Sequence, residues 1–184
     1  ADDLKLLSGV GPALEKKLPV LKLGRLQARL NGRKLAALGL NDMLIVHDHP
    51  ATTSRYRLRI GQSEEFQKSS GVWVATAAGS GSAVLAAGGK RLAWTSKKYQ
   101  YRPRELYRGR LSGGKLTGGT LDGNRSVNLT WLMRRGSIFV DGSHVRIPLG
   151  YADQVEIRLL SANPTQVLGL RGSRRRPPAT EDRL

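Results

Sequence analysis

The sequence predicts a mainly β protein whose short strands form a β-sandwich-like domain. Two observations favour this fold class. Short apolar or alternating segments recur along residues 20–170, and turn residues such as Asn31-Gly32 and Asp141-Gly142 separate them. Only residues 1–19 place apolar side chains at three- and four-residue intervals, which predicts a short N-terminal helical hairpin.

The N-terminal hairpin is expected to consist of two short helices joined by a glycine-rich bend. Gly9 and Gly11 interrupt the apolar pattern, Pro12 suits the first turn of a second helix, and Pro19 ends that helix. The segment resembles one helix-hairpin-helix motif, a family in which hairpin amides bind nucleic-acid phosphates without reading sequence. The alternative is a helical connector with a glycine cap.

Strands and turns follow from residue 20. Asn31-Gly32 is a favoured two-residue hairpin turn, and residues 56–60 alternate apolar and basic side chains as a half-buried strand does. One or two helical turns are expected at 83–87, within a small-residue stretch. The arginine-rich tail 171–184 is expected to be flexible. The other expected strands are Val72–Ala75, 127–133, 137–140, 144–148, 154–160 and 166–170.

Composition excludes several kinds of site. The 184 residues contain no cysteine, which excludes a disulfide scaffold, a thiolate zinc site and a cysteine nucleophile. No apolar run approaches the roughly 20 residues of a membrane span, and the acidic N-terminus lacks the order of a secretory signal. We therefore expect an intracellular protein, cytoplasmic or mitochondrial, without a membrane partner.

No catalytic residue and no metal site are predicted. The chain has no Gly-x-Ser-x-Gly elbow and no convincing nucleophile triad. His47 and His49 flank Asp48 and could share a strand face, but no third ligand is evident. A loop before Pro50 is the favoured interpretation of this histidine pair.

Charge is the strongest bulk signal. Lys and Arg total 31 against 14 acidic residues, a formal net charge of +17. Such an excess favours polyanionic partners, of which nucleic acid is the commonest. The alternative is a basic protein from an arginine-rich proteome, and composition leaves the two interpretations open.

Three separated segments resemble the C-terminal domain of NAD kinases, and the similarity covers about residues 22–170. The first segment, LNDMLIV at 40–46, has an apolar residue, then Asn and an acid, then a strand. The second, 68–89, has a strand that ends in a Thr-x-x-Gly-Ser turn, a short helix and a Gly-Gly pair. The third, 140–157, resembles the closing strands of the family, in which an Asp-Gly turn precedes a hairpin.

The resemblance implies an NAD site. In the family, the Asn-acid pair binds the NAD substrate, and here that pair is Asn41 and Asp42. The residues of the second segment that match the family without a gap are Thr76, Gly79, Ser80, Gly88 and Gly89. Small residues let the backbone approach a nucleotide closely.

Several positions depart from the family pattern. Ser70-Gly71 stands where most members have Asp-Gly, although this variant resembles the mitochondrial type of the family. Ala77 and Ala78 replace the usual Pro and Thr, Ala83 stands where a Tyr usually packs against the substrate, and Ala86 where Ser is common. Each of these changes removes a polar or aromatic contact.

Complete NAD kinases also have a Rossmann-like half, which carries a Gly-Gly-Asp-Gly-Thr loop for ATP and catalysis. These 184 residues contain no such loop, and Gly118–Gly123 is expected to be a turn. The resemblance therefore implies a domain that binds NAD as substrate or ligand, uses ATP only when the missing half is supplied, and is inactive alone. It also implies a homo-oligomer.

A second hypothesis is a catalytically silent, RNA-contacting subunit of a ribonucleoprotein such as an organellar ribosome. The net charge, the helical hairpin, the eroded pocket positions and the basic-aromatic stretch 97–110 favour it, since such stretches can stack bases and hold phosphates. In the alternative, the Tyr rings of that stretch pack inward. The candidate nucleic-acid contacts are Gly9, Gly11, Lys16, Lys17, Lys97, Lys98, Arg102, Arg104, Arg174, Arg175 and Arg176.

Overall fold

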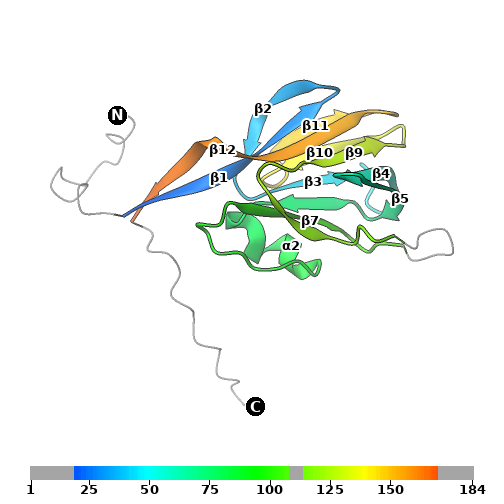
Figure 1. Ribbon diagram of the computed structural model, residues 1–184. Helices are drawn as coiled ribbons and strands as arrows, with labels where there is room; N and C mark the ends of the chain where they lie inside the picture. Colours follow the sequence, from blue (N-terminus) through cyan, green and yellow to red (C-terminus); the bar gives the residue numbers. More distant parts are fainter. Residues whose placement is uncertain (1–18, 108–113, 170–184) are drawn as a thin grey trace, which may run out of the picture.

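The computed structural model describes residues 19–107 and 114–169, and these residues form two six-stranded antiparallel sheets (Figure 1). Sheet A has the order β2-β1-β12-β9-β4-β5, and sheet B has the order β11-β10-β3-β6-β7-β8. The expectation of a mainly β, sandwich-like domain is confirmed. The strands of sheet A are β1 (Val20–Leu30), β2 (Arg33–Gly39), β4 (Ser54–Ile60), β5 (Ser63–Ser69), β9 (Val127–Trp131) and β12 (Gln154–Leu168). Those of sheet B are β3 (Asp42–Val46), β6 (Val72–Ala75), β7 (Lys98–Pro103), β8 (Gly119–Asp122), β10 (Gly136–Val140) and β11 (Val145–Leu149).

Alternation along the strands builds the core between the sheets. In β4, Tyr56 and Leu58 are fully buried, whereas the three arginines between and beside them are exposed. The Tyr56 ring stacks on Trp131 of β9, with centroids 6.5 Å apart. Sheet B contributes the other half of the core, and its fully buried side chains include Met43, Ile45, Val72, Val74, Tyr99 and Ile138.

Two predicted turns form as expected. Asn31 and Gly32 both have positive φ, which a two-residue hairpin of this kind requires, and they join β1 to β2. Asp141 and Gly142 also have positive φ, and they begin the four-residue turn 141–144 that joins β10 to β11. Asp and Asn tolerate this conformation better than most residues other than Gly.

Three parts of the sheets differ from the sequence expectation. The expected strands 154–160 and 166–170 are replaced by the single strand β12, which runs through both and ends at Leu168, because β1 pairs along it across an irregularity between Leu23 and Arg25. β5 was not expected, and it forms as the hairpin partner of β4. The expected turn at residues 118–123 contains β8, an edge strand on β7.

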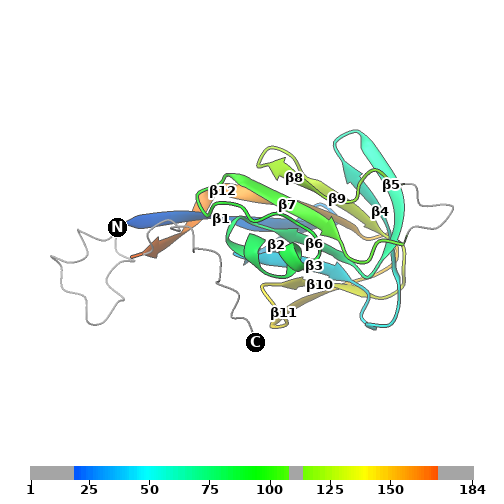
Figure 2. The ribbon, with the colours of Figure 1, turned by 90° about the horizontal axis from the view of Figure 1, so that it is seen from below.

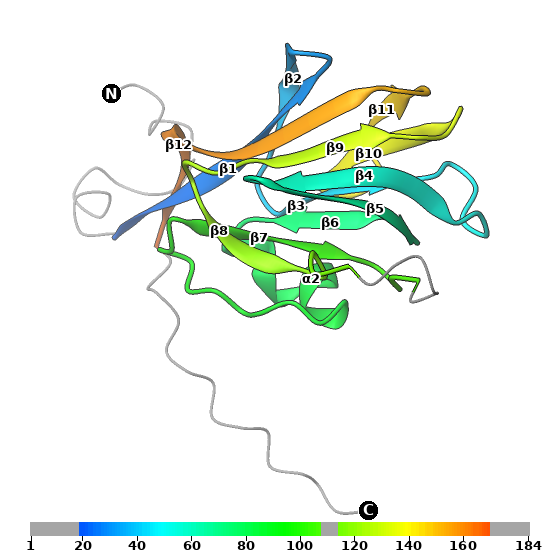
Figure 3. The ribbon, with the colours of Figure 1, turned by 45° about the vertical axis from the view of Figure 1, so that its right-hand side comes forward.

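A short helical segment covers part of the outer face of sheet B, the face away from sheet A (Figures 2 and 3). It consists of the 3₁₀ turn η2 (Ala78–Gly81) and the one-turn helix α2 (Ala83–Ala86), where helical turns were expected. Val84 of α2 is fully buried. The carboxamide of Gln100 in β7 accepts the N–H of Lys90 and donates to its carbonyl. Within residues 19–107 and 114–169, no helix has the length and hydrophobicity of a membrane span.

Two expectations lie outside the described residues. The helical hairpin expected over residues 1–19 lies outside them except for Pro19, and the arginine-rich tail 171–184 lies outside them entirely. Their candidate nucleic-acid contacts, namely Gly9, Gly11, Lys16, Lys17, Arg174, Arg175 and Arg176, therefore have no structural description.

The start of β10 gives a test of the core. A Cβ at Gly136 would overlap the indole ring of Trp131, which is fully buried and donates its N–H to the Arg135 carbonyl (3.1 Å). We expect Gly136→Ala to lower the free energy of unfolding by about 1–3 kcal/mol, because overpacking displaces a ring that has no room to move. Gly150→Ala is the control, since its Cβ would make only an ordinary contact of 3.8 Å with Asp153. Urea denaturation measures both, and equal effects would contradict the overlap.

Candidate nucleotide-binding site

Three turns meet at one end of sheet B and bring the predicted NAD residues together. β3 lies between β10 and β6, so that Met43 pairs with Val140 and Asp42 pairs with Ala75. The turn before β3 therefore lies between the hairpin turn after β10 and the turn after β6. These three turns carry residues 40–42, 141–142 and 76–80.

Asp141 holds the backbone N–H groups of the first turn. Its carboxylate accepts hydrogen bonds from the N–H groups of Leu40 (2.7 Å), Asn41 (2.7 Å) and Asp42 (3.1 Å). The Asp141 N–H donates in return to the Asp42 carbonyl at 3.0 Å. Hydrogen bonds to a charged acceptor are the stronger kind, so this carboxylate fixes three consecutive peptide units.

Thr76 holds the carbonyls of the same turn. Its hydroxyl donates to the Leu40 carbonyl at 2.6 Å, and its N–H donates to the Asn41 carbonyl at 2.9 Å. The hydroxyl also accepts the Gly79 N–H at 3.2 Å. A Cβ at Gly79 would overlap the Asn41 carbonyl, so glycine permits the two turns to touch.

Ser80, Gly88 and Gly89 fix the remainder of the small-residue segment. The Ser80 hydroxyl donates to the Ala77 carbonyl (2.7 Å) and accepts the Leu92 N–H (2.8 Å). Gly88 has a φ of +86°, and a Cβ at Gly89 would lie 2.6 Å from the Val84 carbonyl oxygen. These three residues, like Thr76 and Gly79, thus hold the backbone of the segment, and the hydroxyls of Thr76 and Ser80 are buried.

The hydrogen bonds from Asp141 and Thr76 to the backbone of residues 40–42 are called the clamp below. The side chains of Asn41 and Asp42 take no part in it. Asn41 is exposed, and its carboxamide makes no hydrogen bond to any residue in the described part of the chain. The Asp42 carboxylate is half-buried and likewise has no hydrogen-bonded partner within 19–107 and 114–169. Burial, and secondarily the Asp141 carboxylate, raises the pKa of Asp42 above its ordinary value.

Asp42 lies at the edge of an apolar pocket of about 270 Å³ on the outer face of sheet B. Leu44, Trp73 and Phe139 supply its apolar lining, and the hairpin turn at Gly142 and Ser143 closes one side. The Arg104 guanidinium lies 5.9 Å from the centroid of the Trp73 ring. A carboxylate beside an apolar surface can accept hydrogen bonds from sugar hydroxyls while a flat ring packs on the aromatic side chains. Sequence reasoning missed Asp141 as a positioning residue and the three apolar side chains, although outward alternation along β3, β6 and β10 could have indicated the latter.

The four alanines that depart from the family pattern add no polar or aromatic group to this region. Ala77 is buried, Ala78 and Ala83 are half-buried, and Ala86 is exposed.

The candidate nucleic-acid contacts in β7 and its flanks occupy varied positions. Lys97 is exposed, and Lys98 forms an ion pair with Asp122 at 3.7 Å. The Arg102 Nε donates to the Ala87 carbonyl at 2.8 Å, and Arg104 lies over Trp73. The rings of Tyr99 and Tyr101 are buried in the core, where they have no access to nucleic-acid bases, whereas Tyr107 is exposed. Burial raises the pKa of both buried tyrosines.

The histidine pair has a local backbone role. The Nδ1 of His47 accepts the N–H of His49 at 3.0 Å, and Asp48 pairs with Arg146 at 2.9 Å. Within the described ranges, no group of three or more His, Cys, Asp or Glu residues could hold a metal ion.

The Asp141 clamp predicts a graded loss of stability. Asp141→Ala removes the acceptor of three N–H groups and places Ala at a φ of +50°, and we expect it to cost about 2–3 kcal/mol of unfolding free energy. Asp141→Asn keeps one acceptor oxygen and tolerates the backbone conformation, so we expect about 1 kcal/mol. Asp122→Ala, which breaks only an exposed ion pair, is the control and should change stability by less than about 0.5 kcal/mol. Urea denaturation that ranks the control with Asp141→Ala would contradict the clamp.

Comparisons with known proteins agree with this architecture. None of the protein-family models matches the chain. The chain is 35% identical over 142 residues to a rice protein (Oryza sativa subsp. japonica) named "Probable NADH kinase", and the match covers 74% of this chain and 44% of the rice protein. The crystal structure of yeast NADH kinase complexed with NADH matches with a TM-score of 0.71 at 15% identity, over 86% of this chain and 48% of the yeast chain.

The chain thus spans less than half the length of both relatives. The yeast structure shows a shared fold, and the rice protein shares sequence over 74% of this chain. On these two likenesses, the chain belongs to the NAD kinase family, of which it carries the C-terminal β-rich domain.

Proposed function

We propose that this domain binds NAD(H), and that the side chains of Asn41 and Asp42 make the direct contacts. The observation that carries the proposal is the clamp around residues 40–42, which fixes the backbone of both residues and leaves both side chains without a partner in the described part of the chain. The relatives support it, since one is named as an NADH kinase and the other was crystallised with NADH.

The chemistry of the two side chains suits a dinucleotide. A carboxamide donates and accepts hydrogen bonds at once, so Asn41 can bind a ribose hydroxyl or a base edge. The Asp42 carboxylate accepts hydrogen bonds, and its raised pKa reflects a desolvated anion that would gain from two hydroxyl donors. In this proposal Thr76, Gly79, Ser80, Gly88 and Gly89 shape the site and act as positioning residues.

Phosphoryl transfer enters the proposal only in a larger assembly. The named activity of the relatives is that of a kinase, and the family uses ATP together with a Gly-Gly-Asp-Gly-Thr loop, which these 184 residues do not contain. We therefore assign ligand binding to this domain and no catalytic residue to it. ATP would be used only together with a polypeptide that supplies the loop.

Asn41 gives the most direct test of the contact. We expect Asn41→Ala to weaken NADH binding about tenfold, because it removes a hydrogen-bonding group of about 1.4 kcal/mol from the complex. Titration followed by NADH fluorescence measures the change. Stability should stay within about 0.5 kcal/mol of the parent, since the carboxamide has no partner among the described residues. Asn124→Ala, on the exposed turn between β8 and β9, is the control, and equal affinity for Asn41→Ala and the control would sink the assignment.

We expect the ionised carboxylate of Asp42 to lower the free energy of unfolding and to strengthen NADH binding. The pKa of Asp42 is higher in the folded than in the unfolded protein, where it is about 3.9. Ionisation of Asp42 therefore lowers the free energy of unfolding as the pH rises from the unfolded-state pKa through the folded-state pKa. The loss is complete above both pKa values. Asp42→Asn should therefore unfold at a higher urea concentration than the parent at pH 7, and this advantage should disappear near pH 3. The same variant should bind NADH at least about tenfold more weakly. A variant that loses both stability and binding at pH 7 would show a structural role for the carboxylate.

A further inference from the structure

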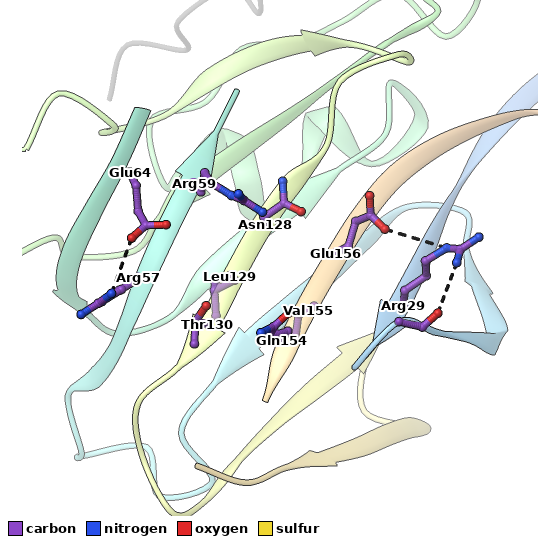
Figure 4. Close-up of a pocket in the computed structure, with 11 residues that line it drawn as sticks. Arg29, Arg57, Arg59, Glu64, Asn128, Leu129, Thr130, Gln154, Val155 and Glu156 are labelled. Atoms are coloured by element: carbon purple, nitrogen blue, oxygen red, sulfur yellow. Dashed lines mark hydrogen bonds and ion pairs between the residues drawn. The ribbon is translucent and has the colours of Figure 1, made fainter. Parts of the chain in front are cut away.

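The outer face of sheet A, on the opposite side of the sandwich core from Asp42, carries a polar groove of about 440 Å³ (Figure 4). Its floor crosses four strands. Arg29 comes from β1, Glu156 from β12, Asn128 from β9 and Arg59 from β4, and the cross-strand register places these side chains in one row. A second row holds Gln154, Thr130 and Arg57.

Basic side chains dominate this face. Arg55, Arg57 and Arg59 alternate along β4 on the side away from the buried Tyr56 and Leu58. Alternate residues of a strand lie about 6.6 Å apart, so the three arginine side chains leave the strand from evenly spaced Cα atoms on one face. The spacing is comparable to the phosphate repeat of an extended single-stranded nucleic acid.

The acidic residues on this face are too few to neutralise the row. Glu156 pairs with both Arg29 (3.8 Å) and Arg158 (2.5 Å), and Glu64 pairs with Arg57 at 3.7 Å. Neither Arg55 nor Arg59 forms an ion pair with any carboxylate of residues 19–107 and 114–169. Such exposed pairs are weak, so a stronger polyanion can replace the carboxylates.

Exposed aromatic rings lie beside the arginine row. Phe66 of the edge strand β5 pairs in register with Arg57, and its side chain is 44% exposed. Tyr107 is 58% exposed, and its N–H donates to the Lys68 carbonyl of the same strand. The Lys68 ammonium lies 6.0 Å from both ring centroids. Together the three residues form a basic-aromatic platform on the edge of the sheet.

We propose that this face binds a single-stranded nucleic acid, with its phosphates along Arg55, Arg57 and Arg59 and bases stacked on Phe66 and Tyr107. Cations that follow the backbone and aromatic rings that stack bases are the two features of general single-strand binding. The uncharged groups on the groove floor can bind sugar hydroxyls and base edges. The surface is separate from the NAD(H) proposal, since the sandwich core lies between the two sites.

The test is the affinity of the full chain for RNA and DNA oligonucleotides of about 15 nucleotides, measured by fluorescence anisotropy at several salt concentrations. We expect the triple variant Arg55→Gln, Arg57→Gln, Arg59→Gln to bind at least about tenfold more weakly and to lower the slope of log K against log salt by about 2, since three phosphate contacts are lost. The control removes three charges from β7 and the segment before it by Lys90→Gln, Lys97→Gln and Lys98→Gln. Lys97 and Lys98 are candidate nucleic-acid contacts from the sequence, so this control separates that stretch from the arginine face, and it should stay within about threefold of the parent.

A second variant, Phe66→Ala with Tyr107→Ala, keeps every charge. We expect it to weaken single-strand binding severalfold at an unchanged salt slope, because stacking releases no counterions. Urea denaturation of every variant reports whether the domain is folded, independently of oligonucleotide binding and of the NAD(H) proposal. The proposal is overturned if the parent binds no oligonucleotide at about 0.05 M salt, if the lysine control weakens binding as much as the arginine variant, or if duplex RNA binds as tightly as the single strand.

Discussion

The carboxylate of Asp141 determines the geometry of the candidate site. The backbone of residues 40–42 lies at the point where β3 begins, so its N–H groups lack the regular ladder partners of a strand interior. Asp141 accepts all three of these N–H groups, while Thr76 takes the carbonyls of Leu40 and Asn41 from the other side. The same peptide units are thus held by residues far apart in the sequence, and a shift of either turn would move Asn41 and Asp42.

Residues that hold the backbone of the candidate site differ from those whose side chains have no partner in the described part of the chain. Thr76, Gly79 and Ser80 have a composition typical of nucleotide loops, yet their hydroxyls and close approaches serve the protein's own backbone. The side chains of Asn41 and Asp42 have no such role among the described residues, and to these two we assign the proposed contacts with NAD(H). Asp42 is kept at a cost to the fold, because its carboxylate is desolvated, lies near a second carboxylate and has no described hydrogen-bond donor. A carboxylate whose pKa is shifted by burial and by a neighbouring charge is typical of functional sites.

The two outer faces of the sandwich have different characters. That of sheet B is partly covered by the 78–90 segment and is apolar beside Asp42, where the half-buried side chains of Leu44, Trp73 and Phe139 line a pocket. That of sheet A is polar and basic, with the arginine row of β4 across its centre. The tyrosines of the expected basic-aromatic stretch 97–110 therefore do not lie together on one surface. Tyr99 and Tyr101 belong to the core, whereas Tyr107 joins Phe66 and Lys68 on the edge of sheet A.

The sequence by itself determined the β fold class, the turns at Asn31-Gly32 and Asp141-Gly142, and the kinship with NAD kinases, because alternation, turn residues and short motifs are local properties of the chain. It could not reveal that residues 154–168 form one strand, since that continuity depends on pairing with β1 more than a hundred residues away. It also could not separate the residues whose side chains hold the protein's own backbone from Asn41 and Asp42, whose side chains have no hydrogen-bond partner in the described part of the chain. Only the tertiary structure decided this, because Thr76 and Asp141 hold residues 40–42 from two other turns, and sheet pairing alone brings these three turns together.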